Sequence, residues 1–332
     1  ELDIITGANS TRKGDVSFQP RRRPQPPIHL KCNDYGSPYP TMVVEVGFTE
    51  DLLSLHRLAR EYFSARTTIQ VYLAIKIFCR YTNGTRLLVA LLYLRTNANP
   101  LIPRAISFGS RGLHHATIEH TLSTIGIQST IEIWSNFQLK SIPELDMYTT
   151  ANSFNVVDGS IISSRVPRPP VEQACNGGRD PYPAMVIEIG NSQSLTSLYN
   201  LAKKYFSPHI PVQIYLAIKL YPRRSDGTKS MVALRFLRTN PTPTRPDVVI
   251  SFGTAPLPHG AKATLRAKRV PAGIITGLLQ RGDPPCDAPG IPAYSMNFPA
   301  AHLFNRDPAG VPAGLAASFN LDLWPIQTEV MS

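Results

Sequence analysis

The stretch Pro40-Thr41-Met42-Val43-Val44-Glu45-Val46-Gly47 is a short apolar run with one carboxylate near its end. Its β-branched content predicts a buried strand, and the residues that follow, 49–51, are typical of the start of a helix. A carboxylate inside an apolar strand costs too much free energy to be buried unpaired. Glu45 therefore needs a metal ion, another cation or water beside it, and this need is the first indication of function.

The same stretch returns at residues 183–190 as Pro-Ala-Met-Val-Ile-Glu-Ile-Gly. Glu45 aligns with Glu188 at an offset of 143 (188 − 45), which holds without a gap for about a hundred residues. A period of this length indicates two copies of a domain and not a solenoid. We therefore predict a first domain at 1–143 and a second at 144–285. A Pro-, Gly- and Ala-rich tail at 286–332 is expected to dock on the second repeat through Phe319, Leu321 and Trp324.

Each copy shows the same succession of patterns. In the first copy, strands are predicted at 15–19, 42–46 and 105–108, and an amphipathic helix with Thr49 as its N-cap at 50–65. Residues 69–78 and 87–94 predict a long hairpin around Asn83-Gly84, matched by Asp226-Gly227 in the second copy. This order predicts an α/β (α+β) fold in which each copy has a mixed β-sheet, a packed helix and a long β-hairpin.

Composition limits the class of protein. With 332 residues, 42% of them hydrophobic, the chain is long enough for two cores. No apolar run reaches the roughly eighteen residues needed to span a bilayer, and no secretory signal pattern is present, so we expect a soluble intracellular protein. The four cysteines form no CxxC pair, which favours free thiols over a zinc site. Glu1 stands in place of methionine, which suggests that the sequence begins inside a longer chain.

The net charge is +11 and the pI is about 9.6, which favours a polyanionic partner such as nucleic acid. Part of the excess is clustered at 21–23 and between Lys262 and Arg269. Solvated charge without a partner explains either cluster taken alone equally well. The chain contains no phosphate-binding glycine-rich loop, so no nucleotide cofactor is predicted, and no Gly-x-Ser-x-Gly elbow.

Two acids of the strand region are kept in both copies: Asp15 matches Asp158 and Glu45 matches Glu188. Carboxylates side by side repel unless a cation lies between them, and Mg²⁺ binds one or two carboxylates together with water and phosphate oxygens. This pattern favours metal-assisted hydrolysis of a phosphodiester, with Mg²⁺ or Mn²⁺ as the cofactor. The alternative is that the aspartates are turn or strand-edge residues and the glutamates have structural partners.

A resemblance supports the first of these interpretations. Residues 14–18, 40–46, the helical segment 58–63 and the strand at 69–75 together resemble the Uma2-type branch of the PD-(D/E)XK nuclease superfamily. The resemblance covers about residues 1–95 and 144–238. It implies two tandem restriction-endonuclease-like domains and Mg²⁺-dependent endonuclease cleavage of DNA. The implied metal ligands are Asp15, Glu45, Asp158 and Glu188, and the implied basic residues of the helix are Arg60 and Lys203.

The chain also departs from this family. Gly47 and Gly190 occupy the lysine position of the parent ExK pattern, and residues 41 and 184 are Thr and Ala where the family often has Asp. Arg60 keeps a charge but cannot act as a base, and Glu61 replaces Lys204, so the second copy is the better candidate for activity. Loss of the ExK lysine supports a different function, a duplicated pseudo-nuclease that acts as a nucleic-acid-binding or protein-interaction scaffold. Retention of both acids in both copies supports the enzyme.

Several polar residues are weaker candidates. Lys76 and Lys219 match in a predicted strand, where each could contact a phosphate or extend to solvent. Gln70 and Gln213 also match, and such polar residues usually cap strand edges. The histidines at 114, 115 and 120 have no counterparts in the second copy, so a metal site there has little support.

Overall fold

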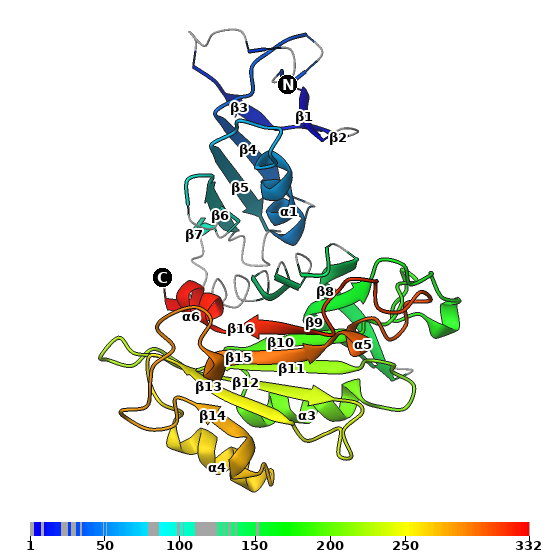
Figure 1. Ribbon diagram of the computed structural model, residues 1–332, viewed down its shortest axis with the longest axis vertical. Coiled ribbons are helices and arrows are strands. Elements are labelled where there is room, and N and C mark those ends of the chain that lie inside the picture. The colour runs from blue at the N-terminus through cyan, green and yellow to red at the C-terminus, as the bar shows by residue number, and fades with distance from the viewer. Residues whose placement is uncertain are drawn as a thin grey trace. The chain divides into compact units, whose positions relative to one another are not determined.

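The computed structural model divides into two compact units, Glu1–Ile118 and Glu119–Ser332 (Figure 1). It describes residues 3–7, 10–20, 26–27, 31–33, 35–48, 50, 52–78, 86–97, 100–101, 103–109, 124, 126–128, 130–131, 134–136, 138–150 and 153–331. The predicted domain limits at 143 and 285 stay predictions. None of the helices in these ranges is both long enough and apolar enough to cross a membrane.

Unit 1 is built on a mixed five-stranded sheet with the order β3-β4-β5-β6-β7. Its strands are β3 (Val16–Phe18), β4 (Met42–Gly47), β5 (Val71–Ile77), β6 (Leu87–Leu94) and β7 (Arg104–Gly109). Helix α1 (Leu52–Tyr62) connects β4 to the parallel strand β5, and the other pairs are antiparallel. A separate antiparallel pair is formed by β1 (Asp3–Gly7) and β2 (Ser10–Lys13).

Unit 2 has a seven-stranded sheet with the order β14-β13-β12-β11-β10-β9-β8. Its strands are β8 (Leu139–Thr150), β9 (Ser153–Ser163), β10 (Met185–Gly190), β11 (Ile214–Leu220), β12 (Ser230–Leu237), β13 (Val248–Gly253) and β14 (Ile275–Gly277). Helix α3 (Leu195–Tyr205) connects the parallel strands β10 and β11, and α4 (His259–Ala267) lies between β13 and β14 in the chain. Short 3₁₀ turns occur at Val171–Gln173, Ala272–Ile274 and Pro292–Tyr294.

The internal repeat of the sequence is visible in the element limits. Helix α1 and helix α3 begin 143 residues apart (195 − 52) and end 143 residues apart (205 − 62). Strands β7 and β13 begin 144 residues apart (248 − 104), which is the slip expected from the sequence. The prediction of a mixed α/β fold with a packed helix and a hairpin in each copy is confirmed.

The predicted helix limits are slightly too wide. The helix expected at 50–65 spans Leu52–Tyr62, and Thr49 lies outside the described residues. In the second copy the N-cap is Ser194, whose side chain accepts a hydrogen bond of 3.0 Å from Ser197 N. The turn at 83–84 also lies outside the described residues, whereas Gly227 has a φ of 78°, as the turn predicted there requires.

The sheet of unit 2 is covered on both faces. Buried residues of α3 and α4 pack on one face, and the C-terminal tail packs on the other. The tail forms β15 (Ser295–Pro299), α5 (Ala300–Leu303), β16 (Ser318–Asp322) and α6 (Trp324–Met331). Figure 1 shows β15 and β16, in orange and red, lying across the sheet. Phe319 and Leu321 are buried in the apolar cluster between the sheet and the tail, and Trp324 packs against this cluster.

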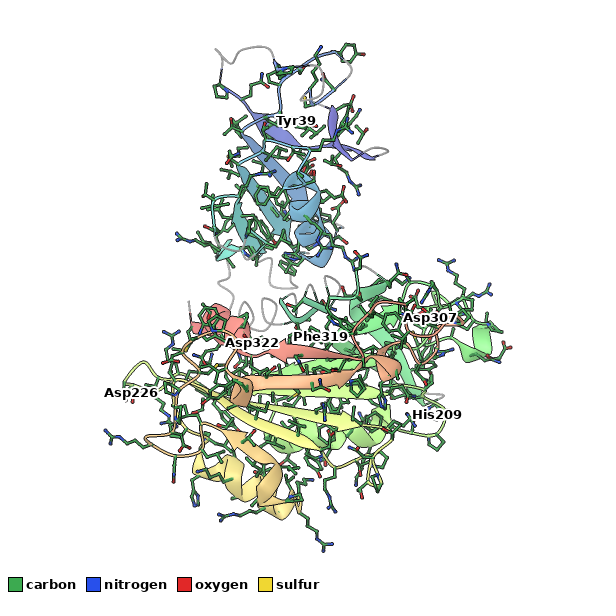
Figure 2. All side chains as sticks on the ribbon, viewed as in Figure 1. Tyr39, His209, Asp226, Asp307, Phe319 and Asp322 are labelled. Carbon is green, nitrogen blue, oxygen red and sulfur yellow. The ribbon has the colours of Figure 1, made fainter. Side chains whose placement is uncertain are left out.

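A buried carboxylate links the tail to β9. The Asp307 side chain is 0% exposed and accepts a hydrogen bond of 2.8 Å from Arg165 Nε. It also accepts hydrogen bonds from the Ser163 hydroxyl and from Ala309 N. Figure 2 labels Asp307 and Phe319 within unit 2. The tail is therefore held by apolar packing and by one charged cluster.

Candidate active site

Strand register brings the two predicted acids of unit 2 together. Strands β9 and β10 are antiparallel and pair Gly159 with Ile187, so Asp158 lies opposite Glu188 in the same register. Asp158 Oδ2 accepts a hydrogen bond of 2.7 Å from Ile189 N, and the Asp158 carboxyl group also hydrogen-bonds to Glu188. Side chains directly opposite on neighbouring strands face each other at about 5 Å between Cβ atoms, which allows this contact.

Glu188 is only 3% exposed. Burial, and next the charge of Asp158, raise the pKa of Glu188 well above that of an ordinary glutamate, although a hydrogen bond from Tyr205 and the charge of Lys204 oppose the rise. Two carboxylates in contact cannot both be ionised cheaply in a buried site. The pair therefore retains a proton at neutral pH unless a cation compensates its charge.

A tyrosine orients Glu188. Tyr205 is fully buried at the last residue of α3, and its hydroxyl donates a hydrogen bond to Glu188 Oε1. Asn155 Nδ2 donates in turn to the Tyr205 hydroxyl at 3.0 Å. Glu188 Oε1 is thus held by a chain of hydrogen bonds that runs through Tyr205 to Asn155.

Unit 1 repeats the arrangement. Asp15 Oδ2 accepts a hydrogen bond of 2.6 Å from Val46 N, and the Tyr62 hydroxyl donates to Glu45 Oε1. Burial, the largest effect, and the neighbouring Asp15 raise the pKa of Glu45, and the hydrogen bond from Tyr62 partly offsets them. All four acids predicted from the sequence therefore lie in two equivalent pairs.

The glycines at the ExK lysine position have a packing cause. A Cβ added to Gly190 would lie 2.6 Å from Leu198 Cδ1, and one added to Gly47 would lie 2.8 Å from Leu55 Cδ1. Both leucines belong to the helix that covers the strand, so a side chain at either glycine would have to displace a packed leucine. A basic group near the acids has to come from another element.

The helix phase decides which lysine this is. Successive residues of an α-helix are about 100° apart, so Lys203 lies about 200° around α3 from Tyr205, whereas Lys204 lies about 100° away. Lys204 is the lysine whose charge affects the pKa of Glu188. Lys203 and Lys204 are both exposed, and Arg60 and Glu61 hold the equivalent positions in α1. The structure thus identifies Lys204 as the lysine near the acids. The sequence pattern indicates Lys203 and shows Lys204 only as the counterpart of Glu61.

The charges at this position are reversed in unit 1. Glu61 replaces Lys204, and Arg12 replaces Asn155. The Arg12 guanidinium binds Glu61 through two hydrogen bonds, of 2.7 Å from Nε and 2.8 Å from the terminal nitrogen. The positive charge near Glu45 therefore comes from a strand residue that is already paired with a carboxylate.

The weaker candidates have structural contacts. Lys76 Nζ donates to Phe48 O at 2.8 Å, and Lys219 Nζ donates to Asn191 O, so both lysines hold the loop after the acid-bearing strand. The two glutamines donate hydrogen bonds to neighbouring carbonyl oxygens, Gln70 to Thr68 and Gln213 to Pro211.

The histidines at 114, 115 and 120 lie outside the described residues. Cys32, Cys175 and Cys286 are buried free thiols, as predicted, and Cys79 is not among the described residues.

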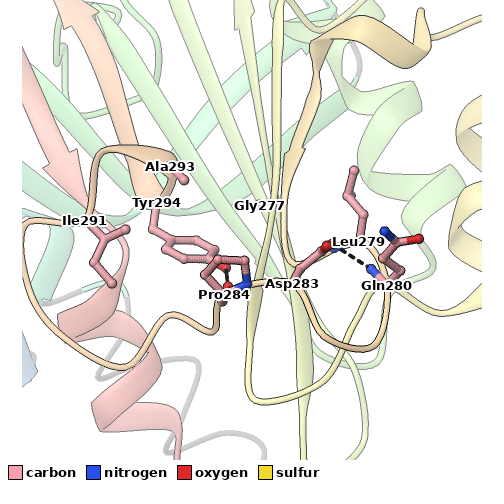
Figure 3. A pocket seen from close by; sticks show the side chains of 8 residues that line it. All are labelled: Gly277, Leu279, Gln280, Asp283, Pro284, Ile291, Ala293 and Tyr294. Atoms are coloured by element: carbon pink, nitrogen blue, oxygen red, sulfur yellow. Dashed lines mark hydrogen bonds between the residues drawn. The ribbon is translucent and has the colours of Figure 1, made fainter.

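A hollow of about 550 Å³ lies elsewhere in unit 2, beside Gly277 and Tyr294 (Figure 3). Its polar groups serve the loop around it: Asp283 Oδ2 accepts hydrogen bonds of 2.9 Å from both Leu279 N and Gln280 N, and the Tyr294 hydroxyl donates to Pro284 O. Asp283 and Tyr294 are therefore already paired with groups of the loop.

Comparison with known proteins adds little to this geometry. No protein-family model matches the chain, and no curated protein matches it. Among solved structures, the chain is similar to a candidate nuclease of the DUF820 family from Anabaena variabilis, with 15% sequence identity and a TM-score of 0.27. This match covers 48% of the present chain and 80% of the other.

Proposed function

We propose that the protein is a metal-dependent endonuclease of the PD-(D/E)XK/Uma2 type that hydrolyses phosphodiester bonds in DNA at Asp158 and Glu188. The observation that supports this most directly is the pairing of an Asp with a Glu at equivalent places in both units, with Glu188 buried in unit 2 and Glu45 half-buried in unit 1. Such a pair destabilises a fold unless its charge is compensated, and apolar residues would pack there at lower cost. Its presence in both units therefore favours a ligand.

The donor set suits Mg²⁺ or Mn²⁺. Among the described residues, no group of three or more His, Cys, Asp or Glu side chains is placed to hold a metal, so two carboxylates would supply the protein ligands. Magnesium is typically held in this way, with water and phosphate oxygens completing its shell. The bound ion would polarise the phosphate and lower the pKa of a water molecule.

The protein residues have distinct roles in this proposal. Ile189 N and the Tyr205 hydroxyl each hold one oxygen of an acid, and a bound cation would replace the proton that the two carboxyl groups share. The Lys204 ammonium group stabilises the negative charge that develops on the phosphate oxygens. Lys203, predicted from the sequence, contributes positive charge at the exposed side of the helix.

For unit 1 we propose a non-catalytic role in binding nucleic acid. Unit 1 would then be a pseudo-nuclease scaffold, the alternative raised from the sequence, while unit 2 is the enzyme. The observation that favours it is the Arg12–Glu61 ion pair, with 2.7 Å between Nε and Oε2. Glu61 of this pair occupies the position of Lys204, so unit 1 has a carboxylate where unit 2 has an ammonium group.

The test is cleavage of supercoiled plasmid with Mg²⁺ or Mn²⁺ by the wild type, Glu188→Gln and Glu45→Gln. Glutamine keeps the volume and can still accept the tyrosine hydrogen bond, so the fold is retained. We expect Glu188→Gln to lower the rate by about 10² or more, as expected for loss of an electrostatic catalytic group, and Glu45→Gln to change it little. Wild-type protein that binds DNA but cleaves it with neither metal would be a non-catalytic scaffold, contrary to this proposal.

A further inference from the structure

Helices α3 and α4 form a basic surface on one face of the unit 2 sheet. Both helices pack into the same buried cluster, and they are linked by a hydrogen bond of 2.9 Å from Lys268 Nζ to Asn200 Oδ1. Neither 195–206 nor 258–270 contains an Asp or Glu. We call this surface the α3–α4 ridge, and its members are Lys203, Lys204, Arg266, Lys268 and Arg269.

The ridge charges are presented in different ways. Lys203, Lys204, Arg266 and Arg269 are exposed. Lys268 is half-buried, and its ammonium group lies 5.3 Å from the centre of the Tyr199 ring, which fixes its position. Arg269 follows the C-cap of α4 with a φ of 57°, a left-handed conformation in which glycine is usual.

The ridge begins at the carboxylate pair. Lys204 directly precedes Tyr205, whose hydroxyl donates a hydrogen bond to Glu188, and Asn200 lies one helical turn earlier on the same side of α3 as Lys204. Asn200 contacts Lys268 of the neighbouring helix, and Arg269 is the next residue. Positive charge therefore extends from the site along α3 and onto the end of α4.

We propose that the α3–α4 ridge binds the phosphate backbone of the DNA whose scissile bond lies at Asp158 and Glu188. This inference rests on the proposed function and adds to it the surface that holds the substrate. Because lysine and arginine contacts to phosphate release counterions, the affinity supplied by the ridge is salt-dependent and largely independent of base sequence.

The test measures binding of a short fluorescent DNA duplex to the full chain by anisotropy, in EDTA and over a series of KCl concentrations. We compare the wild type with Arg266→Gln/Arg269→Gln and with a control of equal charge change, Lys140→Gln/Arg168→Gln, which alters two exposed residues outside the ridge. Each phosphate contact adds about 0.9 to the slope of log K against log salt. The ridge variant loses two arginines, so we expect the slope to become less negative by about 2. In the control we expect the slope to stay at the wild-type value.

The possible failures are distinguishable. If the wild type cleaves and binds DNA but the ridge variant keeps the wild-type slope, the ridge inference is overturned and the proposed function stands. An equal fall of the slope in both variants would also overturn it, because the effect would then follow net charge and not position. Wild-type protein that neither binds nor cleaves DNA would overturn the proposed function together with the ridge.

Discussion

Lys204 and Glu61 occupy the same helix position in the two copies and carry opposite charges. The copies differ at a second position as well, where Asn155 in β9 of unit 2 corresponds to Arg12 in β2 of unit 1. The tyrosine and the two acids around them are kept. The two sites therefore differ mainly in where the positive charge lies, and this difference is the basis for proposing catalysis in unit 2 and not in unit 1.

A pair of lysine variants tests this assignment. We expect Lys204→Ala to lower plasmid cleavage by about 10² to 10³, because it removes the cation beside the acids. Lys203→Ala makes the same chemical change one residue away, on another side of the helix, and is expected to lower cleavage far less. Initial rates at saturating DNA measure the difference.

The opposite ranking of the two lysine variants would show that α3 presents Lys203 to the substrate. Equal, small effects would show that neither lysine stabilises the reaction. Circular dichroism of both variants serves as the folding control, and both side chains are exposed, so neither change disturbs the core.

At the scale of elements, the attachment of the tail to β9 depends on Asp307. Burial alone would raise the pKa of Asp307, but hydrogen bonds from Ser163, Ala309 N and Arg165 outweigh it and lower the pKa. The folded state thus binds a proton at Asp307 less readily than the unfolded state does. Its contribution to stability is complete above the unfolded pKa of about 3.9 and is lost as the pH falls through the lower folded value.

We expect Asp307→Asn to lower the free energy of unfolding by about 2 kcal/mol at pH 7. The difference from the wild type should shrink as the pH falls from about 4 toward the lower pKa of the folded state, because the unfolded state is protonated first and the folded Asp307 becomes neutral only below its own pKa. Urea denaturation at a series of pH values measures it. Asp287→Asn alters an exposed carboxylate of the same tail and should change stability by less than about 0.5 kcal/mol. A difference at Asp307 that does not vary with pH would contradict the charge argument.

At the scale of the whole molecule, equivalent strands are buried to different extents in the two units. Ile250 and Phe252 of β13 are 2% and 0% exposed under the tail, whereas Ile106 and Phe108 of β7, their counterparts in unit 1, are 63% and 41% exposed. Unit 2 has a buried apolar cluster on each face of its sheet. One cluster includes residues of α3 and α4, and the other includes residues from the tail. The tail is thus an integral part of unit 2.

Because the tail completes the core of unit 2, the behaviour of fragments with and without it can be predicted. A fragment of residues 119–332 should fold cooperatively by itself and show the proposed metal-dependent cleavage, because its core and carboxylate pair are complete. A fragment of residues 119–285 lacks the tail and leaves one apolar sheet face uncovered, so it should bind a hydrophobic dye and aggregate. Thermal unfolding and size-exclusion chromatography measure both. Cooperative folding of the shorter fragment would show that the tail is dispensable.

The sequence by itself determined the repeat, the order of strands and helices in each copy, and the four acids. These features are readable because alternation along a strand, helical spacing and an internal comparison all depend on residues close in sequence or at a constant offset. The elements of the tail were not predicted, because their apolar residues pack against strands far away in the chain and show little local periodicity.

Only the tertiary structure decided which charges accompany the acids. The phase of α3 selects Lys204 over Lys203, and the Arg12–Glu61 pair joins residues 49 positions apart. The Ser163–Asp307 contact spans 144 positions. Contacts at such separations depend on how strands and helices pack, and the sequence pattern of each segment holds no record of its partner. The acids could therefore be found from sequence, whereas their electrostatic surroundings required the fold.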